Sequence, residues 1–203
     1  MNTITIVGLT GQTGSGKTTI CGVFEQCGFI VINADLVARE VTQKGSPCLK
    51  ELVEVFGEKI LTDDGQLNRK LLGGIVFGNK TLLEQLNSIS YPYITAEILS
   101  RIEGFKKSGK KLILLDAPTL FESRTDDFCE LIISVIAKPE IRLARIMERD
   151  GLSEEDARNR IKSQQEEQFF IQNSDFIIKN NKGMDNLQSV AKEVAEKIRN
   201  LYL

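Results

Sequence analysis

The sequence contains no histidine and no tryptophan, and it has only 4 prolines and 4 cysteines. Without histidine, no catalytic scheme can use an imidazole base, and a common zinc ligand is missing. The cysteines show no C-x-x-C spacing, so neither a zinc site nor a disulfide framework is expected. This pattern indicates the reduced cysteines of a cytoplasmic protein. They are Cys21, Cys27, Cys48 and Cys129.

Long apolar runs and a strong excess of charge are also missing. No run approaches the roughly 18 apolar residues of a membrane span. The net charge is −2, so we expect neither a nucleic-acid partner nor attraction to an anionic membrane. The chain enters its first strand almost at once, which leaves no room for a signal peptide. Its 203 residues are enough for one α/β domain with insertions.

What the sequence does contain is a complete G-x-x-x-x-G-K-[ST] motif between an expected strand and an expected helix. Its glycines let main-chain N–H groups close around phosphate oxygens, and the helix start adds partial positive charge. Lys17 can bridge the terminal phosphates and the Thr18 hydroxyl can bind magnesium. The motif therefore predicts binding of a nucleoside triphosphate. Its residues are Gly11, Gln12, Thr13, Gly14, Ser15, Gly16, Lys17 and Thr18.

Five apolar or alternating segments predict the strands of a mostly parallel sheet. The last helix carries an apolar stripe at 3-to-4 spacing, from Leu187 to Leu201, which we expect to pack on that sheet. The predicted strands are Thr3–Val7, Phe29–Ile32, Lys111–Asp116, Leu131–Ile136 and Phe176–Ile178.

Residues 36–109 read as helical and more polar, with separate helices expected over Lys80–Ile89 and Ile94–Lys107 on either side of Pro92. This is more helix than a plain crossover between parallel strands needs. We interpret it as an insertion that binds the acceptor. The alternative is a long helical crossover without a ligand.

Two acidic residues follow buried strands. Asp35 comes after the second strand, at the sheet edge where open α/β proteins bind ligands. It is a candidate general base, or else the N-cap of a helix starting at Leu36. Asp116 ends the third strand as the magnesium-associated Asp of phosphate-loop proteins does, which is a weak signal.

Arginines gather between the fourth and fifth strands. Arg142, Arg145 and Arg149 are three and four residues apart, so they share one helix face. Ser153 and the acidic residues after it predict the capped start of a second helix. A helical hairpin of this kind can close as a lid and clamp phosphates. Arg158 and Arg160 belong to the same stretch, and the alternative is a solvated, salt-bridged surface.

Together, these motifs resemble the dephospho-CoA kinase family over nearly the whole chain. The phosphate loop alone is shared by many families, whereas the ordered set is specific. The matching segments are Gly8–Thr19, Asn33–Val41, Phe56-Gly57 with Asp64–Arg69, Pro118–Glu122, Arg142–Arg145, Gln164, and Ser174-Asp175 with Asn180.

The resemblance implies an α/β protein with a three-layer P-loop NTPase fold. It would have a five-stranded parallel sheet, a helical substrate-domain insertion and a helical lid. The nucleotide-binding core would comprise 1–35, 110–138 and 172–203, the CoA-binding insertion 36–109, and the lid 139–171. The implied reaction transfers the γ-phosphate of ATP, with Mg²⁺, to the ribose 3′-hydroxyl of dephospho-CoA, the last step of coenzyme A synthesis. A monomer or weak oligomer is expected.

The resemblance also implies roles for single residues. Asp35 matches the proposed base, Arg145 the lid arginine and Arg69 a substrate-domain arginine, while Asn180 falls near the adenine of ATP. Lys17 and Arg145 join Asp35 as catalytic residues. The expected ATP-binding set is Gly11, Gln12, Thr13, Gly14, Ser15, Gly16, Lys17, Thr18, Thr19, Arg142, Arg145 and Asn180. The expected acceptor-binding set is Asp35, Arg39, Arg69, Tyr91, Pro118 and Leu120.

Three positions depart from the family pattern, which commonly has Asp at Asn33, His at Tyr91 and Leu at Thr119. Asn33 keeps hydrogen bonding but loses a charge, and Tyr91 changes contacts to the acceptor. Two other functions remain open. A related small-molecule kinase would require different acceptor contacts in 36–109, and a nucleotide-binding regulatory protein would not need the intact Lys17, Asp35 and Arg145.

Overall fold

The computed structural model describes residues 4–202 and contains a five-stranded sheet in the order β2-β3-β1-β4-β5. The pairs β1–β3, β1–β4 and β4–β5 are parallel, so the predicted α/β class with a parallel sheet is confirmed. The start that we predicted for the first strand, Thr3, lies outside the described residues. The strands are β1 (Thr5–Gly11), β2 (Ile30–Asn33), β3 (Leu112–Asp116), β4 (Leu131–Ile136) and β5 (Phe176–Lys179).

Helices connect these strands. No helix within residues 4–202 combines the length and the apolar character needed to cross a membrane. The helices are α1 (Lys17–Gln26), α2 (Ala34–Val41), α3 (Pro47–Phe56), α4 (Arg69–Val76), α5 (Lys80–Lys107), α6 (Pro139–Asp150), α7 (Glu154–Lys162), α8 (Glu167–Gln172) and α9 (Met184–Tyr202).

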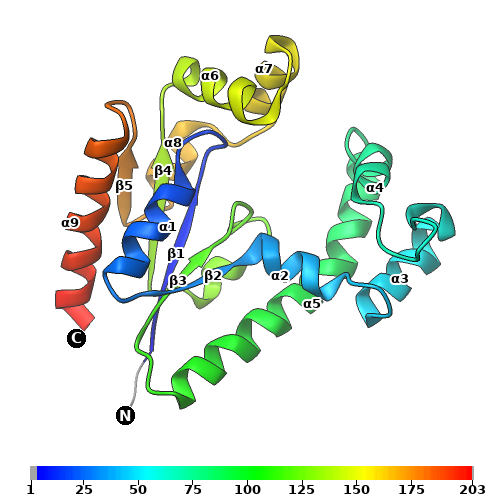
Figure 1. Ribbon diagram of the computed structural model, residues 1–203, viewed down its shortest axis with the longest axis horizontal. Coiled ribbons are helices and arrows are strands. Elements are labelled where there is room, and N and C mark those ends of the chain that lie inside the picture. The colour runs from blue at the N-terminus through cyan, green and yellow to red at the C-terminus, as the bar shows by residue number, and fades with distance from the viewer. Residues whose placement is uncertain (1–3, 203) are drawn as a thin grey trace. The chain divides into compact units, whose positions relative to one another are not determined.

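The chain divides into two compact units, of which the first comprises the described residues up to 32 and from 105 onward. Its main core lies between the sheet and the helices α1 and α9, which Figure 1 shows beside each other along the strands. Val7 and Leu9 of β1 point into this core because alternate strand residues share a face. The predicted stripe of α9 packs there, except that Leu201 is exposed.

The second unit, Asn33–Gly104, is helical and folds around a core of its own. Here the predicted break at Pro92 is wrong, because α5 runs through it as one helix of 28 residues. A proline inside a helix costs about 3 kcal/mol or more. Leu86, Ile89 and Tyr93 pack against the core on both sides of Pro92, and that burial holds the two halves together.

Candidate active site

The phosphate loop turns between β1 and α1, as predicted. The glycines at 11, 14 and 16 all have positive φ values, of 137°, 74° and 106°. At Gly14 an added Cβ would lie 2.9 Å from the backbone oxygen of Arg142, and at Gly16 it would lie 2.6 Å from Nδ2 of Asn180. Glycine is therefore required both by the backbone angles and by the close approach of neighbouring groups.

Polar groups of the loop are turned inward. Lys17 Nζ donates a hydrogen bond of 3.2 Å to the backbone oxygen of Gly11. Gln12 Oε1 and Ser15 Oγ are buried and have no hydrogen-bond partner within the described residues 4–202. Buried polar atoms without partners are rare, so these two atoms are candidates for hydrogen bonds to a polar ligand.

Two arginines of α6 contact the loop directly. Arg142 is only 3% exposed, and its Nε donates to the backbone oxygen of Thr13 at 2.9 Å. Burial lowers the pKa of the Arg142 guanidinium, and the charge of Glu167 opposes that shift. One turn further on, Arg145 donates to the backbone oxygen of Gly14 at 3.2 Å. The first turns of the expected lid thus lie against the phosphate loop.

Two amide side chains from other segments complete these contacts. Asn180, just after β5, is buried, donates to the backbone oxygen of Ser15 at 2.7 Å and accepts from Arg145 at 3.3 Å. The amide nitrogen of Asn180 thus contacts the loop, and its amide oxygen contacts Arg145. Asn180, which was expected near the adenine of ATP, here makes a hydrogen bond to the phosphate loop. Gln164 accepts hydrogen bonds from the amide of Thr13 and from Arg142. Sequence reasoning matched Gln164 to the family pattern but gave it no role.

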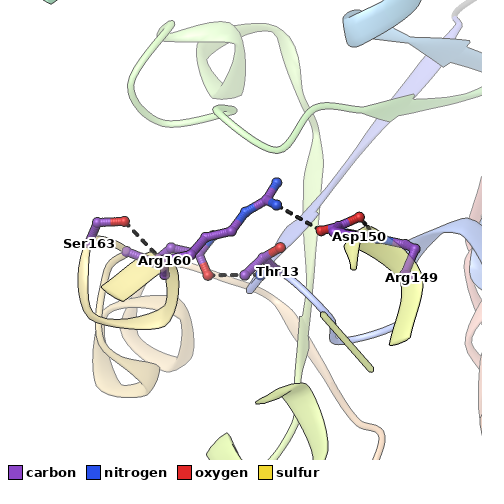
Figure 2. A network of polar contacts seen from close by, with 6 residues as sticks. Thr13, Arg149, Asp150, Arg160 and Ser163 are labelled. Carbon is purple, nitrogen blue, oxygen red and sulfur yellow. Dashed lines mark hydrogen bonds and ion pairs between the residues drawn. The ribbon is translucent and has the colours of Figure 1, made fainter. Parts of the chain in front are cut away.

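The other arginines of the hairpin lie in ion pairs. Figure 2 shows Asp150 between Arg149 and Arg160. Arg149 contacts both carboxylate oxygens at 2.8 Å, and Arg160 contacts one at 2.7 Å. Arg158 pairs with Glu154 at 2.6 Å. These three residues thus form ion pairs of the kind that the alternative of a salt-bridged surface described, while Arg142 and Arg145 donate hydrogen bonds to the loop.

Asp35 lies in the first turn of α2 and is exposed. The alternative in which it caps this helix is wrong, because the N-cap is Asn33, whose side chain accepts from the amide of Leu36 at 2.9 Å. Asn caps as well as Asp does, so the departure from the family pattern at Asn33 keeps this local role. The Asp35 carboxylate has no hydrogen-bond or ion-pair partner in the described part of the chain.

Arg39 and Arg69 lie next to each other in the second unit. Arg69 donates to the backbone oxygen of Arg39 at 3.2 Å and to the hydroxyl of Thr42 at 2.5 Å. Burial, followed by the positive charge of Arg39, lowers the pKa of Arg69. Neither arginine pairs with a carboxylate among residues 4–202. Guanidinium groups that are not paired with a carboxylate are suited to binding a phosphate group.

The remaining acceptor candidates have different surroundings. Tyr91 is half-buried on α5, and Pro118 is exposed in the segment after β3. The Leu120 side chain is completely buried and would lie 2.9 Å from a Cβ added at Gly8. The expectation that the Leu120 side chain contacts an acceptor is therefore corrected, because this side chain is part of the hydrophobic core.

The side chains of residues 4–202 would bind Mg²⁺ only together with a nucleotide, whose phosphates supply further oxygen ligands. No group of three or more metal-binding side chains occurs within residues 4–202. The Thr18 hydroxyl, at the exposed start of α1, is the kind of single oxygen donor that Mg²⁺ takes when phosphates and waters supply the rest. Near it, burial and then the charge of Asp116 raise the pKa of Cys21 to about 12, so this thiol is protonated at neutral pH.

Comparisons with known proteins agree with this geometry. A model of the family described as "Dephospho-CoA kinase" matches residues 5–186. A dephospho-CoA kinase of Listeria monocytogenes is 40% identical over 182 residues, which cover 90% of this chain and 91% of the relative. One of Arabidopsis thaliana is 42% identical, over 96% of this chain and 84% of the relative. The structure of a Campylobacter jejuni dephospho-CoA kinase has a TM-score of 0.71 at 30% identity, over 95% and 96% of the two chains.

Proposed function

This chain belongs to the dephospho-CoA kinase family, and we propose on that basis that it transfers the γ-phosphate of ATP to the ribose 3′-hydroxyl of dephospho-CoA. The products are coenzyme A and ADP, and the reaction is the last step of coenzyme A biosynthesis. The observation that carries this conclusion is the match of the family over residues 5–186, which include the phosphate loop and both arginines that contact it.

Lys17, the loop amides and Arg145 stabilise the charge of the transferring phosphoryl group in this proposal. A loose transition state leaves little covalent chemistry to the protein, so positioning and electrostatics dominate. Arg145 supports this role because both groups to which it donates, a backbone carbonyl and an amide oxygen, are neutral. Its positive charge is therefore not cancelled by a hydrogen-bonded carboxylate.

Asp35 orients the acceptor hydroxyl and finally takes its proton. Its exposure and its place in the first turn of α2 leave the carboxylate accessible to a substrate, and the capping of that helix falls to Asn33. A carboxylate that can reach the hydroxyl can act as a general base. The Thr18 hydroxyl is the protein ligand for Mg²⁺, which neutralises phosphate charge when bound with ATP.

Residues 36–109 bind the acceptor in this proposal, residues 139–171 form the lid, and the remaining segments form the nucleotide-binding core. Arg39 and Arg69 are the acceptor-binding residues with the strongest physical support, because Arg69 contacts the backbone of Arg39, feels its positive charge, and guanidinium groups suit the phosphates of dephospho-CoA. Tyr91 and the exposed Pro118 are further candidates. Thr19, which follows the loop, joins the ATP-binding set.

We also propose that the protein acts in the cytoplasm as a monomer or weak oligomer. Four free cysteines fit a reducing compartment. Size-exclusion chromatography with light scattering tests the oligomeric state directly.

The experiment that tests the function is an acceptor panel. Purified protein with Mg²⁺ and ATP is offered dephospho-CoA, nucleoside monophosphates and sugar acids, and ADP release is measured together with product mass. We expect one added phosphate on dephospho-CoA alone. Transfer to another acceptor would replace the substrate but keep the kinase activity. ATP binding without any transfer would favour the regulatory alternative.

The role of Asp35 is tested by Asp35→Asn. We expect turnover to fall by roughly 10² to 10⁴, the usual contribution of general acid–base catalysis. Because Asn33 caps the helix, the thermal stability of the variant should stay close to that of the wild type. An unchanged rate would remove Asp35 from the mechanism.

A further inference from the structure

Gln164 lies in the short connection between α7 and α8, within the proposed lid, but it belongs to none of the catalytic, ATP-binding and acceptor-binding sets given above. Its side-chain oxygen accepts two hydrogen bonds, one from the backbone amide of Thr13 and one from Arg142, both of 2.8 Å. The first donor belongs to the phosphate loop and the second to α6. A single neutral oxygen thus joins the loop to the arginine that lies against it.

The neutrality of that oxygen matters for Arg142. The residue is 3% exposed, and its guanidinium donates hydrogen bonds to the backbone oxygen of Thr13 and to Gln164. Both acceptors satisfy its N–H groups without adding negative charge. A carboxylate at position 164 would make a stronger, charge-assisted bond, and it would also cancel the charge of Arg142 next to the phosphate loop.

We propose that Gln164 is a positioning residue for ATP. It fixes Thr13 and Arg142 in one arrangement and leaves the charge of Arg142 available to the phosphates. The proposal needs ATP as a ligand but not dephospho-CoA as the acceptor. Direct measurement of ATP binding therefore separates its failure from a failure of the proposed function.

Two substitutions of Gln164 test this proposal, because they are expected to have different effects on thermal stability and on ATP affinity. Gln164→Met keeps the side-chain length and removes the oxygen. Gln164→Glu keeps the acceptor and adds a charge. For both variants the Kd of Mg²⁺-ATP is measured by calorimetry, KM and kcat are measured for ATP and for dephospho-CoA, and the melting temperature is recorded.

For Gln164→Met we expect the Kd and KM for ATP to rise about tenfold, which corresponds to about 1.4 kcal/mol. KM for dephospho-CoA should change by less than about twofold, since the lost hydrogen bonds lie on the nucleotide side. For Gln164→Glu we expect the Kd for ATP to rise about fivefold or more while the melting temperature equals or exceeds that of the wild type, because the added charge pairs with Arg142. If Gln164 had only a structural role, the affinity for ATP would fall only in a variant whose melting temperature also falls.

The matched control is Gln172→Glu, which adds the same charge at an exposed position of α8. Its affinity for ATP should equal that of the wild type. The proposal is overturned if Gln164→Met binds ATP within twofold of the wild type, or if KM rises equally for both substrates. If Gln164→Met does not fold, Gln164→Glu decides alone, and unchanged ATP affinity in that variant rejects the proposal.

A double-mutant cycle with Arg142→Met shows whether Gln164 acts through the arginine. Residues in contact give non-additive effects, whereas independent residues add. We expect the double variant to bind ATP little worse than Arg142→Met alone. Fully additive losses would contradict the part of the proposal that concerns Arg142.

Discussion

The α6–α7 hairpin carries arginines in two opposite surroundings. Arg142 and Arg145 donate to backbone carbonyls and amide oxygens, and Arg142 is almost completely buried. Arg149 and Arg160 share the carboxylate of Asp150, and their side chains are 58% and 48% exposed. Within the described residues 4–202 the first two arginines therefore have no hydrogen-bonded carboxylate, whereas the other two are paired with one.

The difference shows that the counter-charge, and not the arginine itself, decides what an arginine in a helix can do. Exposed ion pairs contribute about 0–1 kcal/mol to stability, because solvent screens the pair and two long side chains lose freedom. A guanidinium desolvated among neutral acceptors stays strongly attractive to anions. Arg142 and Arg145 are thus suited to the triphosphate, and Arg149 and Arg160 to stabilising the hairpin.

The largest contrast is expected between Arg145→Ala and Arg149→Ala. We expect Arg145→Ala to lower kcat by about 10² or more, by analogy with a lost oxyanion donor. Arg149→Ala should stay within about twofold, since it breaks only an exposed ion pair. Steady-state kinetics with saturating ATP measures both. Similar losses in the two variants would mean that the paired and the unpaired arginines of the hairpin do not differ in function.

A smaller effect is expected where the backbone of α6 meets the loop. In Gly14→Ala the new Cβ would approach the Arg142 oxygen, and a left-handed non-glycine residue costs roughly 1–2 kcal/mol. We expect the Kd for ATP to rise about tenfold, which corresponds to about 1.4 kcal/mol. Calorimetry with Mg²⁺-ATP measures it.

Gly28→Ala is the matched control for this substitution. Gly28 also has a positive φ, of 92°, but a Cβ there would meet nothing within 4 Å. It should lose stability while keeping its ATP affinity. Equal affinity in the two variants would show that the contact between the loop and α6 is unimportant.

The smallest effect concerns the ion pairs of Asp150 and their pH dependence. The hydrogen bond from Arg149, and then the charges of Arg149 and Arg160, hold the pKa of Asp150 below its ordinary value of 3.8. A lowered pKa in the folded state contributes stability above the ordinary value, and that stability is lost as the pH falls through the folded value. We therefore expect Asp150→Asn to be slightly less stable than the wild type at pH 7.

Below an ordinary pKa of about 4 this difference in stability should shrink, because the Asp150 carboxyl is protonated first in the unfolded chain and then, at lower pH, in the folded protein. Urea unfolding at several pH values tests the trend, and kcat at pH 7 should be unchanged. A stability difference that grows toward low pH would contradict the assigned ion pairs.

Local signals in the sequence predicted the elements that depend on neighbours in the chain. The span predicted for the fourth strand, Leu131–Ile136, is the span observed. Ser153 caps α7 as expected, accepting from the amide of Asp156 at 3.1 Å. These features depend on alternation, glycine positions and capping residues, which act over a few residues. The break at Pro92 was predicted wrongly because the burial of α5 outweighed a local preference.

The amino-acid sequence by itself determined the family, the parallel sheet and the phosphate loop, since each is encoded in residue types at fixed spacing. Only the tertiary structure decided which of five arginines face the loop, because helical spacing places Arg142, Arg145 and Arg149 on one face but does not tell which side chain meets a carboxylate. It likewise brought Gln164 and Asn180 to the loop from distant segments. The contacts of Gln164 with Thr13 and of Asn180 with Ser15 join residues 151 and 165 positions apart, and no local pattern records them.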